Sequence, residues 1–291
     1  PGMAWQRFVR ASSASTFAVT YPAINRSLIG NVGTDDPTLH PWFMSAISGN
    51  KNVFLLIDAS SSTSESAERL HSAKAIATEL LGTLSIGDFA TVVFYASSAK
   101  TYSDGQLHRA TGTHIQALQQ YVNNFGLEST NSTNIGGAIN TAGQILAASD
   151  SHSNCTNVVV LLTGGENSIT DLDPVTQLES TFDVDTFVFS AVLAPNNLNP
   201  AQLVPRALSC STTNGIFQIY SDSDSTVSAF FETFDRVLSS AVVSHTPRWT
   251  EPYDDPMGLG TITTVSRPLL VENDQGQLSL EGVLTIDVKL T

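Results

Sequence analysis

The middle of the chain alternates short apolar runs with longer amphipathic stretches. Nearly continuous apolar runs, typical of strands covered on both faces of a parallel sheet, occupy residues 53–57, 89–95, 158–162, 186–193 and 215–220. Stretches that favour helices occupy residues 64–84, 108–125, 135–148, 200–208 and 227–242. Strands that alternate with helices predict a doubly wound α/β domain with a mostly parallel sheet. A ligand site is then expected at the carboxyl ends of its strands.

The two ends of the chain have a different pattern. They are richer in proline, glycine and aromatic residues, and residues 261–265 and 278–288 read as antiparallel strands joined by a turn at 272–277. Neither end alone is able to close a core. We therefore predict one β-rich domain, formed by residues 1–50 and 244–291, that is interrupted by the α/β domain at residues 51–243.

Charge and length narrow the class of protein. The 291 residues include 27 acidic and 13 basic side chains, for a net charge of -14, and such a field disfavours nucleic acid as a partner. No apolar run is long enough to span a membrane. No basic and apolar leader precedes Pro1, so we expect any signal peptide to have been removed and any anchor to lie outside this sequence.

Cysteines and glycosylation sequons favour an oxidising compartment. Two cysteines, Cys155 and Cys210, are too few for a disulfide scaffold or a four-ligand zinc site. Sequons begin at Asn25, Asn131 and Asn154, which favours a secreted or cell-surface glycoprotein. In that setting the two cysteines can pair with each other.

A carboxylate and two hydroxyls follow the first buried strand. Asp58, Ser60 and Ser62 form the pattern D-x-S-x-S, and their oxygens are the hard ligands that Mg²⁺ and Ca²⁺ prefer. The alternative is that these residues only cap the helix that follows. Thr133 begins a later helix and the run 158–167 ends another strand, so both segments are expected near the same edge of the sheet.

These three ordered segments resemble the von Willebrand factor A domain and its metal-ion-dependent adhesion site. The resemblance covers roughly residues 52–243 and implies that Asp58, Ser60, Ser62 and Thr133, here called the Asp58 rim, hold Mg²⁺ or Ca²⁺. The family usually has an aspartate where this chain has Gly164, so one carboxylate is missing and weaker cation binding is expected. Glu166 is a candidate substitute.

The two ends resemble the halves of a Cache domain, and the whole arrangement resembles the alpha-2-delta subunits of voltage-gated calcium channels. The resemblance implies a disulfide between Cys155 and Cys210; two buried free thiols are the alternative. It also implies a pocket for an amine or amino-acid-like ligand, lined by His40, Trp42, Tyr253, Asp255 and Asp287. His40 replaces the family's arginine, which disfavours a free α-amino acid. The alternative is that the aromatic residues belong to the core and the aspartates cap loops.

The function expected from these observations is non-catalytic. No histidine belongs to a nucleophile signature, and the glycine-rich segments lack the spacing and lysine of a phosphate loop. We expect an extracellular or cell-surface module that binds a protein partner at the Asp58 rim, as a channel auxiliary or an adhesion protein. The alternatives are small-molecule sensing by the Cache-like domain and a structural subunit of a cell-surface or flagellar assembly.

Overall fold

The computed structural model describes a chain of two compact units. The described residues are 3–10, 17–21, 41–61, 66–130, 132–149, 156–164, 173–183, 185–193, 203–220, 227, 229–231, 233–234, 247–255, 260–272 and 278–290. The central unit comprises Asn50–Leu81 and Gly87–Phe230; the flanking unit comprises Pro1–Gly49, Gly82–Ile86 and Phe231–Thr291. Among the described helices, none combines the length and apolar character needed to cross a membrane.

The central unit is built on a seven-stranded sheet. Its members are β3 (Lys51–Asp58), β4 (Phe89–Tyr95), β5 (Ala99–Thr101), β6 (His108–Arg109), β7 (Thr156–Thr163), β8 (Phe187–Leu193) and β9 (Ile216–Tyr220). The order is β5-β4-β3-β7-β8-β9, with β6 also on β4. Strands β4, β3, β7, β8 and β9 run parallel, whereas β5 and β6 are antiparallel to β4. The predicted α/β class with a mostly parallel sheet is therefore confirmed.

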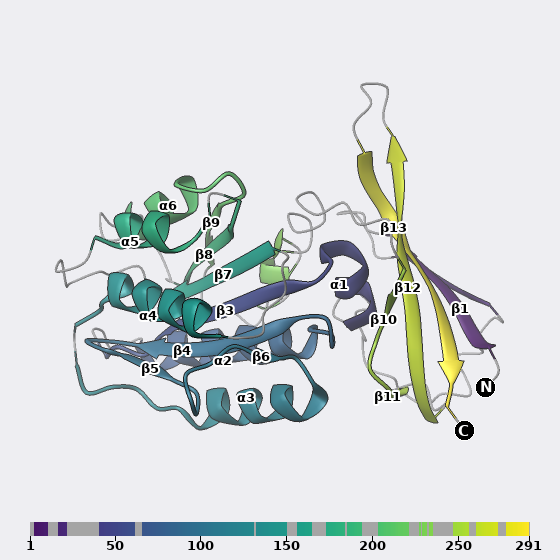
Figure 1. Ribbon diagram of the computed structural model, residues 1–291, viewed down its shortest axis with the longest axis horizontal. Coiled ribbons are helices and arrows are strands. Elements are labelled where there is room, and N and C mark those ends of the chain that lie inside the picture. Colours follow the sequence, from purple (N-terminus) through teal and green to yellow (C-terminus); the bar gives the residue numbers. More distant parts are fainter. Residues whose placement is uncertain are drawn as a thin grey trace. The chain divides into compact units, whose positions relative to one another are not determined.

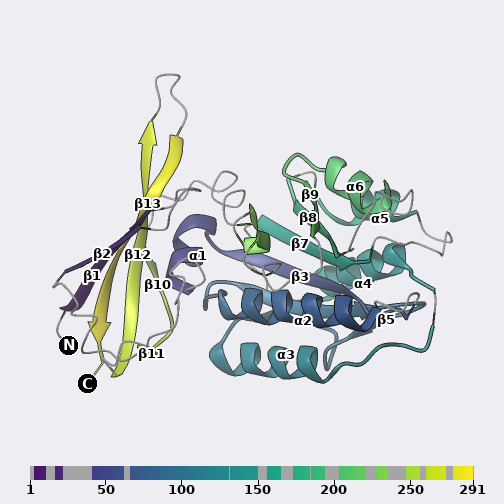
Figure 2. The ribbon, with the colours of Figure 1, turned by 180° about the vertical axis from the view of Figure 1, so that it is seen from behind.

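Helices cover both faces of this sheet. They are α2 (Ser66–Gly82), α3 (Gly112–Asn124), α4 (Ile135–Ala148), α5 (Pro174–Thr181) and α6 (Leu203–Cys210). Figures 1 and 2 show α2 and α3 on one face, and α4 with α5 on the other. On the α4 side, Phe54 and Leu56 of β3 belong to a buried cluster with Ile135 and Ile139 of α4. Burial on both faces explains why these strands read as continuous apolar runs.

The order of the strands fixes where a ligand site can form. The chain passes from β3 to β4 on one side, and then returns across β3 to β7 on the other. This reversal is a topological switch point, and the crevice outside the carboxyl ends of β3 and β7 is the usual ligand position in such sheets. Asp58 ends β3 and Thr163 ends β7.

A buried ion pair anchors the opposite end of β3. The Lys51 Nζ atom lies 3.2 Å from both carboxylate oxygens of Asp88, and the Lys51 backbone N–H donates to Asp88 Oδ1 at 3.0 Å. Both side chains are almost fully buried. The pair connects the start of β3 to the residue that precedes β4 and so fixes the relative position of the two strands.

The flanking unit contains an antiparallel sheet. Its strands are β1 (Met3–Arg10), β2 (Phe17–Tyr21), β10 (Arg248–Trp249), β11 (Tyr253–Asp255), β12 (Gly260–Glu272) and β13 (Leu278–Lys289), in the order β10-β12-β13-β1-β2 with β11 on β12. Strand β1 pairs with β13, so the sheet joins the two ends of the chain. Helix α1 (Pro41–Ser48) packs against β12 and β13.

Two sequence-based expectations for the elements were wrong, and one helix was missed. Residues 41–48 were expected to be β-like but form α1, because the apolar positions Trp42, Phe43, Ala46 and Ile47 are all buried on one short helix. The helix expected from residue 108 begins at Gly112, since His108 and Arg109 pair with β4. Helix α5 was not anticipated. The predicted turn at 272–277 lies almost entirely outside the described residues.

Candidate functional site

The carboxylate of Asp58 accepts hydrogen bonds from three other residues. Its Oδ1 atom accepts from the Ser60 backbone N–H at 2.9 Å. Its Oδ2 atom accepts from the Thr163 hydroxyl at 3.3 Å and, at the long distance of 3.5 Å, from the Gly164 N–H. The end of β7 therefore helps to orient the Asp58 side chain within the switch-point crevice.

Ser60 and Thr133 lie beside this carboxylate. The Thr133 hydroxyl donates to the Ser60 hydroxyl at 3.2 Å, and both side chains are buried. Asn134, the next residue, is the N-cap of α4 and accepts from the Gly137 N–H at 2.7 Å. An N-cap residue begins the helix with a non-helical backbone, so Thr133 is held at the entry to α4 and within reach of β3.

Backbone hydrogen bonds fix the loops that carry these residues. The Ala59 N–H donates to the Tyr95 carbonyl at 2.8 Å, and the Ala59 carbonyl accepts from Glu128 at 2.8 Å. The Ser61 N–H donates to Thr130 at 2.9 Å, and the Asn134 N–H donates to Ala96 at 2.8 Å. The loops after β3 and β4 and the segment before α4 are thus joined directly, so the site is preorganised by the chain itself.

Burial changes the protonation of the two ionisable groups of this site. Burial raises the pKa of Asp58, and the hydrogen bonds from Ser60, Gly164 and Thr163 oppose that rise. Burial and then the charge of Asp58 raise the pKa of Tyr95 well above its ordinary value. Tyr95 therefore remains a neutral phenol, and Asp58 is a desolvated carboxylate whose charged form a bound cation would stabilise.

The donor set fits a hard cation in kind but supplies little charge. Asp58, Ser60 and Thr133 offer oxygen ligands, as Mg²⁺ and Ca²⁺ require. Among the described residues, no group of three His, Cys, Asp or Glu side chains is arranged to hold a metal. The space that a side chain at Gly164 would need is filled by Arg69, since an added Cβ would lie 2.3 Å from Arg69 Nη1. A cation at the Asp58 rim would thus depend on one carboxylate and neutral hydroxyls.

Several predicted residues lie outside the described part of the chain. They are Ser62 of the Asp58 rim, the candidate Glu166, His40, Cys155 and the sequon residues Asn25, Asn131 and Asn154. Cys210 is a free, exposed cysteine among the described residues, which argues against two buried thiols. Its disulfide with Cys155 stays a prediction.

A second polar network lies in the flanking unit. The Tyr253 and Thr264 hydroxyls are 2.7 Å apart, and Thr264 donates to Asp287 Oδ1 at 2.7 Å. Trp42, Asp255 and Asp287 are buried, whereas Tyr253 is half-buried. Thr264 faces Asp287 across the β12–β13 pair, and Ser266 faces Thr285 next to it. The structure thus connects two of the predicted ligand residues, Tyr253 and Asp287, through Thr264.

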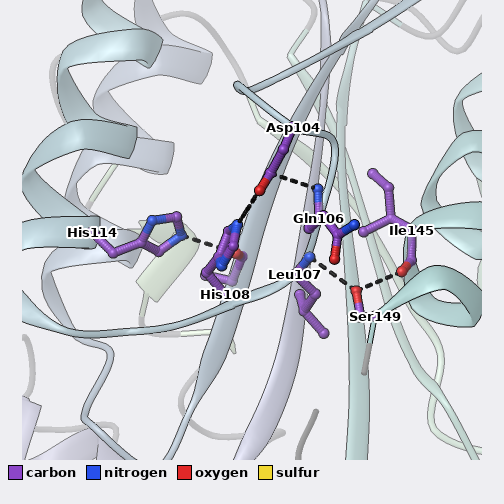
Figure 3. Close-up of polar contacts among 8 residues, drawn as sticks. Asp104, Gln106, Leu107, His108, His114, Ile145 and Ser149 are labelled. Carbon is purple, nitrogen blue, oxygen red and sulfur yellow. Dashed lines mark hydrogen bonds and ion pairs between the residues drawn. The ribbon is translucent and has the colours of Figure 1, made fainter. Parts of the chain in front are cut away.

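Two histidines that are separate in the sequence come together beside β4. Figure 3 shows His108 between Asp104 and His114; His108 Nε2 lies 2.9 Å from Asp104 Oδ2. His114 Nε2 lies 3.3 Å from the Ala90 carbonyl, and the two imidazole rings are 5.2 Å apart. Among the described residues, no serine or cysteine bonds to either ring. The cluster fixes the loop before α3 and shows no nucleophile arrangement.

Three residues at or near the Asp58 rim were not found from the sequence. Thr163 precedes Gly164 in the quoted strand ending, and its position at the end of β7 was the available signal. Tyr95 ends β4 and faces Asp58 in the strand register. Arg69 carries no local signal, because only the packing of α2 brings its guanidinium to Gly164.

The fold and the site define a doubly wound α/β domain with an oxygen-lined rim at its switch point. The family model of the von Willebrand factor type A domain matches residues 52–233, and the chain belongs to this family. Domains of this family are typically protein-interaction modules and commonly bind a divalent metal at this position. The Cache-like character of the flanking unit stays a prediction.

Two curated relatives match different shares of the chain. It is 23% identical to the voltage-dependent calcium channel subunit alpha-2/delta-2 of Homo sapiens, over 100% of this chain and 25% of that protein. The chain thus spans about a quarter of this relative. It is 29% identical to the inter-alpha-trypsin inhibitor heavy chain H1 of Bos taurus, over 40% of this chain and 13% of that protein.

Two solved structures share the fold. A von Willebrand factor type A protein from Catenulispora acidiphila has a TM-score of 0.52 at 18% identity, covering 84% of this chain and 58% of that one. Proximal thread matrix protein 1 from the mussel byssus has a TM-score of 0.53 at 14% identity, covering 67% and 49%. At these identities the likeness concerns the fold alone.

Proposed function

We propose that this protein is a non-catalytic interaction module that binds a protein partner at the Asp58 rim. The observation that carries the proposal is the convergence of Asp58, Ser60 and Thr133 at the switch point of the sheet, in loops fixed by backbone hydrogen bonds. Such preorganisation reduces the conformational entropy lost when a partner binds. Family membership supports an interaction role.

Asp58, Ser60, Ser62 and Thr133 would hold the divalent cation, Mg²⁺ or Ca²⁺. A bound cation supplies a positive charge that accepts an acidic side chain of the partner. The chain's own residues orient that position: Thr163 and Gly164 direct the Asp58 carboxylate, and the Ser60–Thr133 hydrogen bond keeps the two hydroxyls adjacent.

The relatives suggest a setting for this interaction. The similarity to a voltage-dependent calcium channel subunit supports a role as a channel auxiliary or adhesion protein, in an extracellular or cell-surface location. The three sequons and the net charge of -14 are consistent with that location. Its partner would then be a membrane channel or a surface-assembly protein.

Calorimetry with Mg²⁺ and Ca²⁺ tests the cation step. The wild type is expected to bind one divalent ion, and Asp58→Ala is expected to abolish binding without loss of fold. Asp183→Ala removes an exposed carboxylate of the same unit and serves as the matched control. A melting curve and a circular dichroism spectrum establish that each variant is folded. Equal cation binding by the Asp58→Ala variant and the wild type would refute the assignment of Asp58.

The partner step has a separate test. A photo-crosslinking residue at Ser61, next to Ser60, is expected to capture the partner in a reaction that Asp58→Ala suppresses and Asp183→Ala does not. If a crosslink forms to the same extent in all three proteins, the Asp58 rim is not the binding surface.

A second candidate function, sensing of a small amine, rests on the network in the flanking unit. The hydroxyls of Ser266 and Thr285 are buried and have no hydrogen bond partner in the described part of the chain, and they adjoin Thr264 and Asp287. Buried hydroxyls without partners are energetically costly, so they are candidate contacts for a ligand. Asp287 would supply the carboxylate that an ammonium group needs.

Ethylamine and alanine distinguish the two predicted ligand classes. Ethylamine is alanine without its carboxylate, so binding of ethylamine alone supports amine recognition. Asp287→Asn is expected to remove that binding, with Asp254→Asn on the exposed side of β11 as the control. If the wild type binds neither compound, this second candidate function is rejected.

A further inference from the structure

The guanidinium of Arg69 occupies the space beside Gly164 at the switch point. A Cβ added at Gly164 would lie 2.3 Å from Arg69 Nη1 and 3.3 Å from Arg69 Cζ. The Gly164 N–H in turn faces Asp58 Oδ2. The side chain of Arg69, which begins on α2, therefore reaches the strand end that borders the Asp58 rim. A glycine at position 164 is what permits this close approach.

The three lysines of the central unit have polar partners, whereas Arg69 has no carboxylate partner among the described residues. Lys51 pairs with Asp88, Lys100 pairs with Glu128, and Lys74 donates to backbone carbonyls at the end of α3. In the described part of the chain, no carboxylate lies within ion-pair distance of Arg69, and its Nε atom is buried without a hydrogen bond partner. Arg206 also pairs with no described carboxylate, but it is exposed, whereas Arg69 is half-buried and its Nε atom is fully buried.

A partly buried guanidinium without an acceptor is unfavourable in the isolated protein. It presents up to five N–H donors in a planar fork, and each desolvated donor that lacks a partner costs free energy. A carboxylate from outside would satisfy two of these donors at once through paired, charge-assisted hydrogen bonds. A divalent cation would instead be repelled by the same charge.

We propose that Arg69 is a direct binding residue for a carboxylate of the protein partner, so that the Asp58 rim recognises an acidic side chain even without a divalent cation. The inference rests on the proposed function, because it assigns the chemistry of the same interaction surface. Arg69 supplies a fixed positive charge in the space left by Gly164. The partner is therefore a protein that presents an aspartate or glutamate at the centre of its interface.

Acetate and glutarate are the probes for this site. In protein freed of divalent cations by passage over a chelating resin, titration of either carboxylate is expected to shift the side-chain Nε–Hε resonance of Arg69 in an NMR spectrum. Arg69→Met is expected to weaken glutarate binding about tenfold or more, as loss of a paired charge-assisted contact implies. Arg206→Met removes an exposed arginine of the same unit and should leave binding unchanged. Equal weakening in both variants would overturn the proposal.

Two substitutions at Gly164 displace Arg69 without altering it. Gly164→Ala introduces the colliding Cβ and is expected to weaken glutarate binding without weakening Mg²⁺ binding. Gly164→Asp adds a carboxylate that pairs with Arg69, so it should remove glutarate binding and strengthen Mg²⁺ binding about tenfold or more. These variants keep the test valid if Arg69→Met is poorly folded. Unchanged glutarate affinity in both would contradict the proposal.

The outcomes separate this inference from the proposed function. Asp58→Ala should abolish Mg²⁺ binding but retain glutarate binding in the absence of divalent cations, because it removes a negative charge near the site. If the wild type binds no divalent cation and still binds glutarate through Arg69, the cation step fails and the inference stands. If inorganic phosphate shifts the Arg69 resonance and the carboxylates do not, the assignment of a carboxylate ligand is wrong.

Discussion

At the scale of single residues, Asp58 shows how one carboxylate can serve as the centre of a site. Its oxygens are oriented by donors from its own loop and from the end of β7, and burial makes its charged form costly. A group of this kind gains most from a cation or a positively charged neighbour.

The buried pair of Lys51 and Asp88 leads to a prediction about stability. Lys51→Met leaves the Asp88 carboxylate buried without its ammonium partner, so we expect the free energy of unfolding to fall by about 3–5 kcal/mol. Urea denaturation measures this change. The double variant Lys51→Met/Asp88→Asn retains an acceptor for the Lys51 backbone N–H and should recover part of the loss. A loss below about 1 kcal/mol in the single variant would show that the pair is not needed.

His114 predicts a pH dependence of stability. Burial lowers its pKa; its bond to Ala90 and the charge of Asp104 oppose that effect, while His108 adds to it. The folded state therefore binds this proton less tightly than the unfolded state, whose histidine has a pKa of about 6.5. The stabilisation is complete above that pH and is lost as the pH falls towards the lower pKa of the folded state.

The variant His114→Gln tests this pH dependence, because glutamine does not titrate. The wild type should lose more stability between pH 7 and pH 5 than this variant, as measured by melting temperature across the range. His71→Gln alters an exposed histidine of the same unit and should retain the slope of the wild type. Identical slopes in all three proteins would exclude His114 as a source of the pH dependence.

The sequence was sufficient to predict which residues supply oxygen ligands to the site, but not which other residues surround them. Asp58, Ser60 and Thr133 were predictable because strand ends and helix starts in a doubly wound sheet meet at one edge. The sequence showed that Gly164 replaces the aspartate usual in the family, but not that Arg69 occupies the space beside it. The contact with Arg69 depends on the packing of α2 on the sheet, which the residue spacing along the chain does not specify.

At the scale of elements, predictability followed the strength of the local pattern. Helix α4 was predicted with its correct limits, because its apolar positions recur regularly and Asn134 caps it. Helix α5 was missed because it has eight residues and only two buried positions, Pro174 and Leu178. Helix α1 was missed because proline and aromatic residues dominate it, and only tertiary burial makes it helical.

The contact between α4 and α5 leads to a prediction at this scale. Gly143→Ala would usually favour a helix, but a Cβ there would lie 1.8 Å from Thr181 Cγ2. We expect net destabilisation of about 1–3 kcal/mol by chemical denaturation. Adding Thr181→Ser removes the obstructing methyl group and should restore stability. Gly126→Ala has open space around the new Cβ and is the control. A stabilised Gly143→Ala variant would contradict this account of the packing.

At the scale of the whole molecule, the two sheets differ in which parts of the chain supply their strands. The parallel sheet of the central unit is formed by strands that alternate with helices within one stretch of the chain, and its class was readable from the sequence. The antiparallel sheet of the flanking unit pairs residues from opposite ends of the chain, such as Met3 with Val288. The antiparallel pairing of β12 with β13 was predicted from the turn between them and is confirmed, but no local pattern specifies that β1 joins β13.

This topology predicts different behaviour for two truncated chains. A chain of residues 1–243 retains β1 and β2 but lacks β13, so β1 is left with an unpaired edge. Unpaired edges promote association, and we expect this chain to self-associate, whereas residues 51–243 alone should stay monomeric. Light scattering after size-exclusion chromatography measures both masses. Two monomers would show that β1 does not depend on β13.

The pairing of β1 with β13 also determines the order in which the two sheets can form during translation. Residue 288 is translated 285 positions after residue 3, its partner in the register, which at ribosomal rates of 5–20 residues per second is a delay of roughly 15–60 s. The nascent chain can complete its parallel sheet well before β1, which pairs with β2 early, acquires its second neighbour, β13. During that interval the edge of β1 that β13 later covers is unpaired, so a chaperone that shields this edge is expected to raise the yield of folded protein.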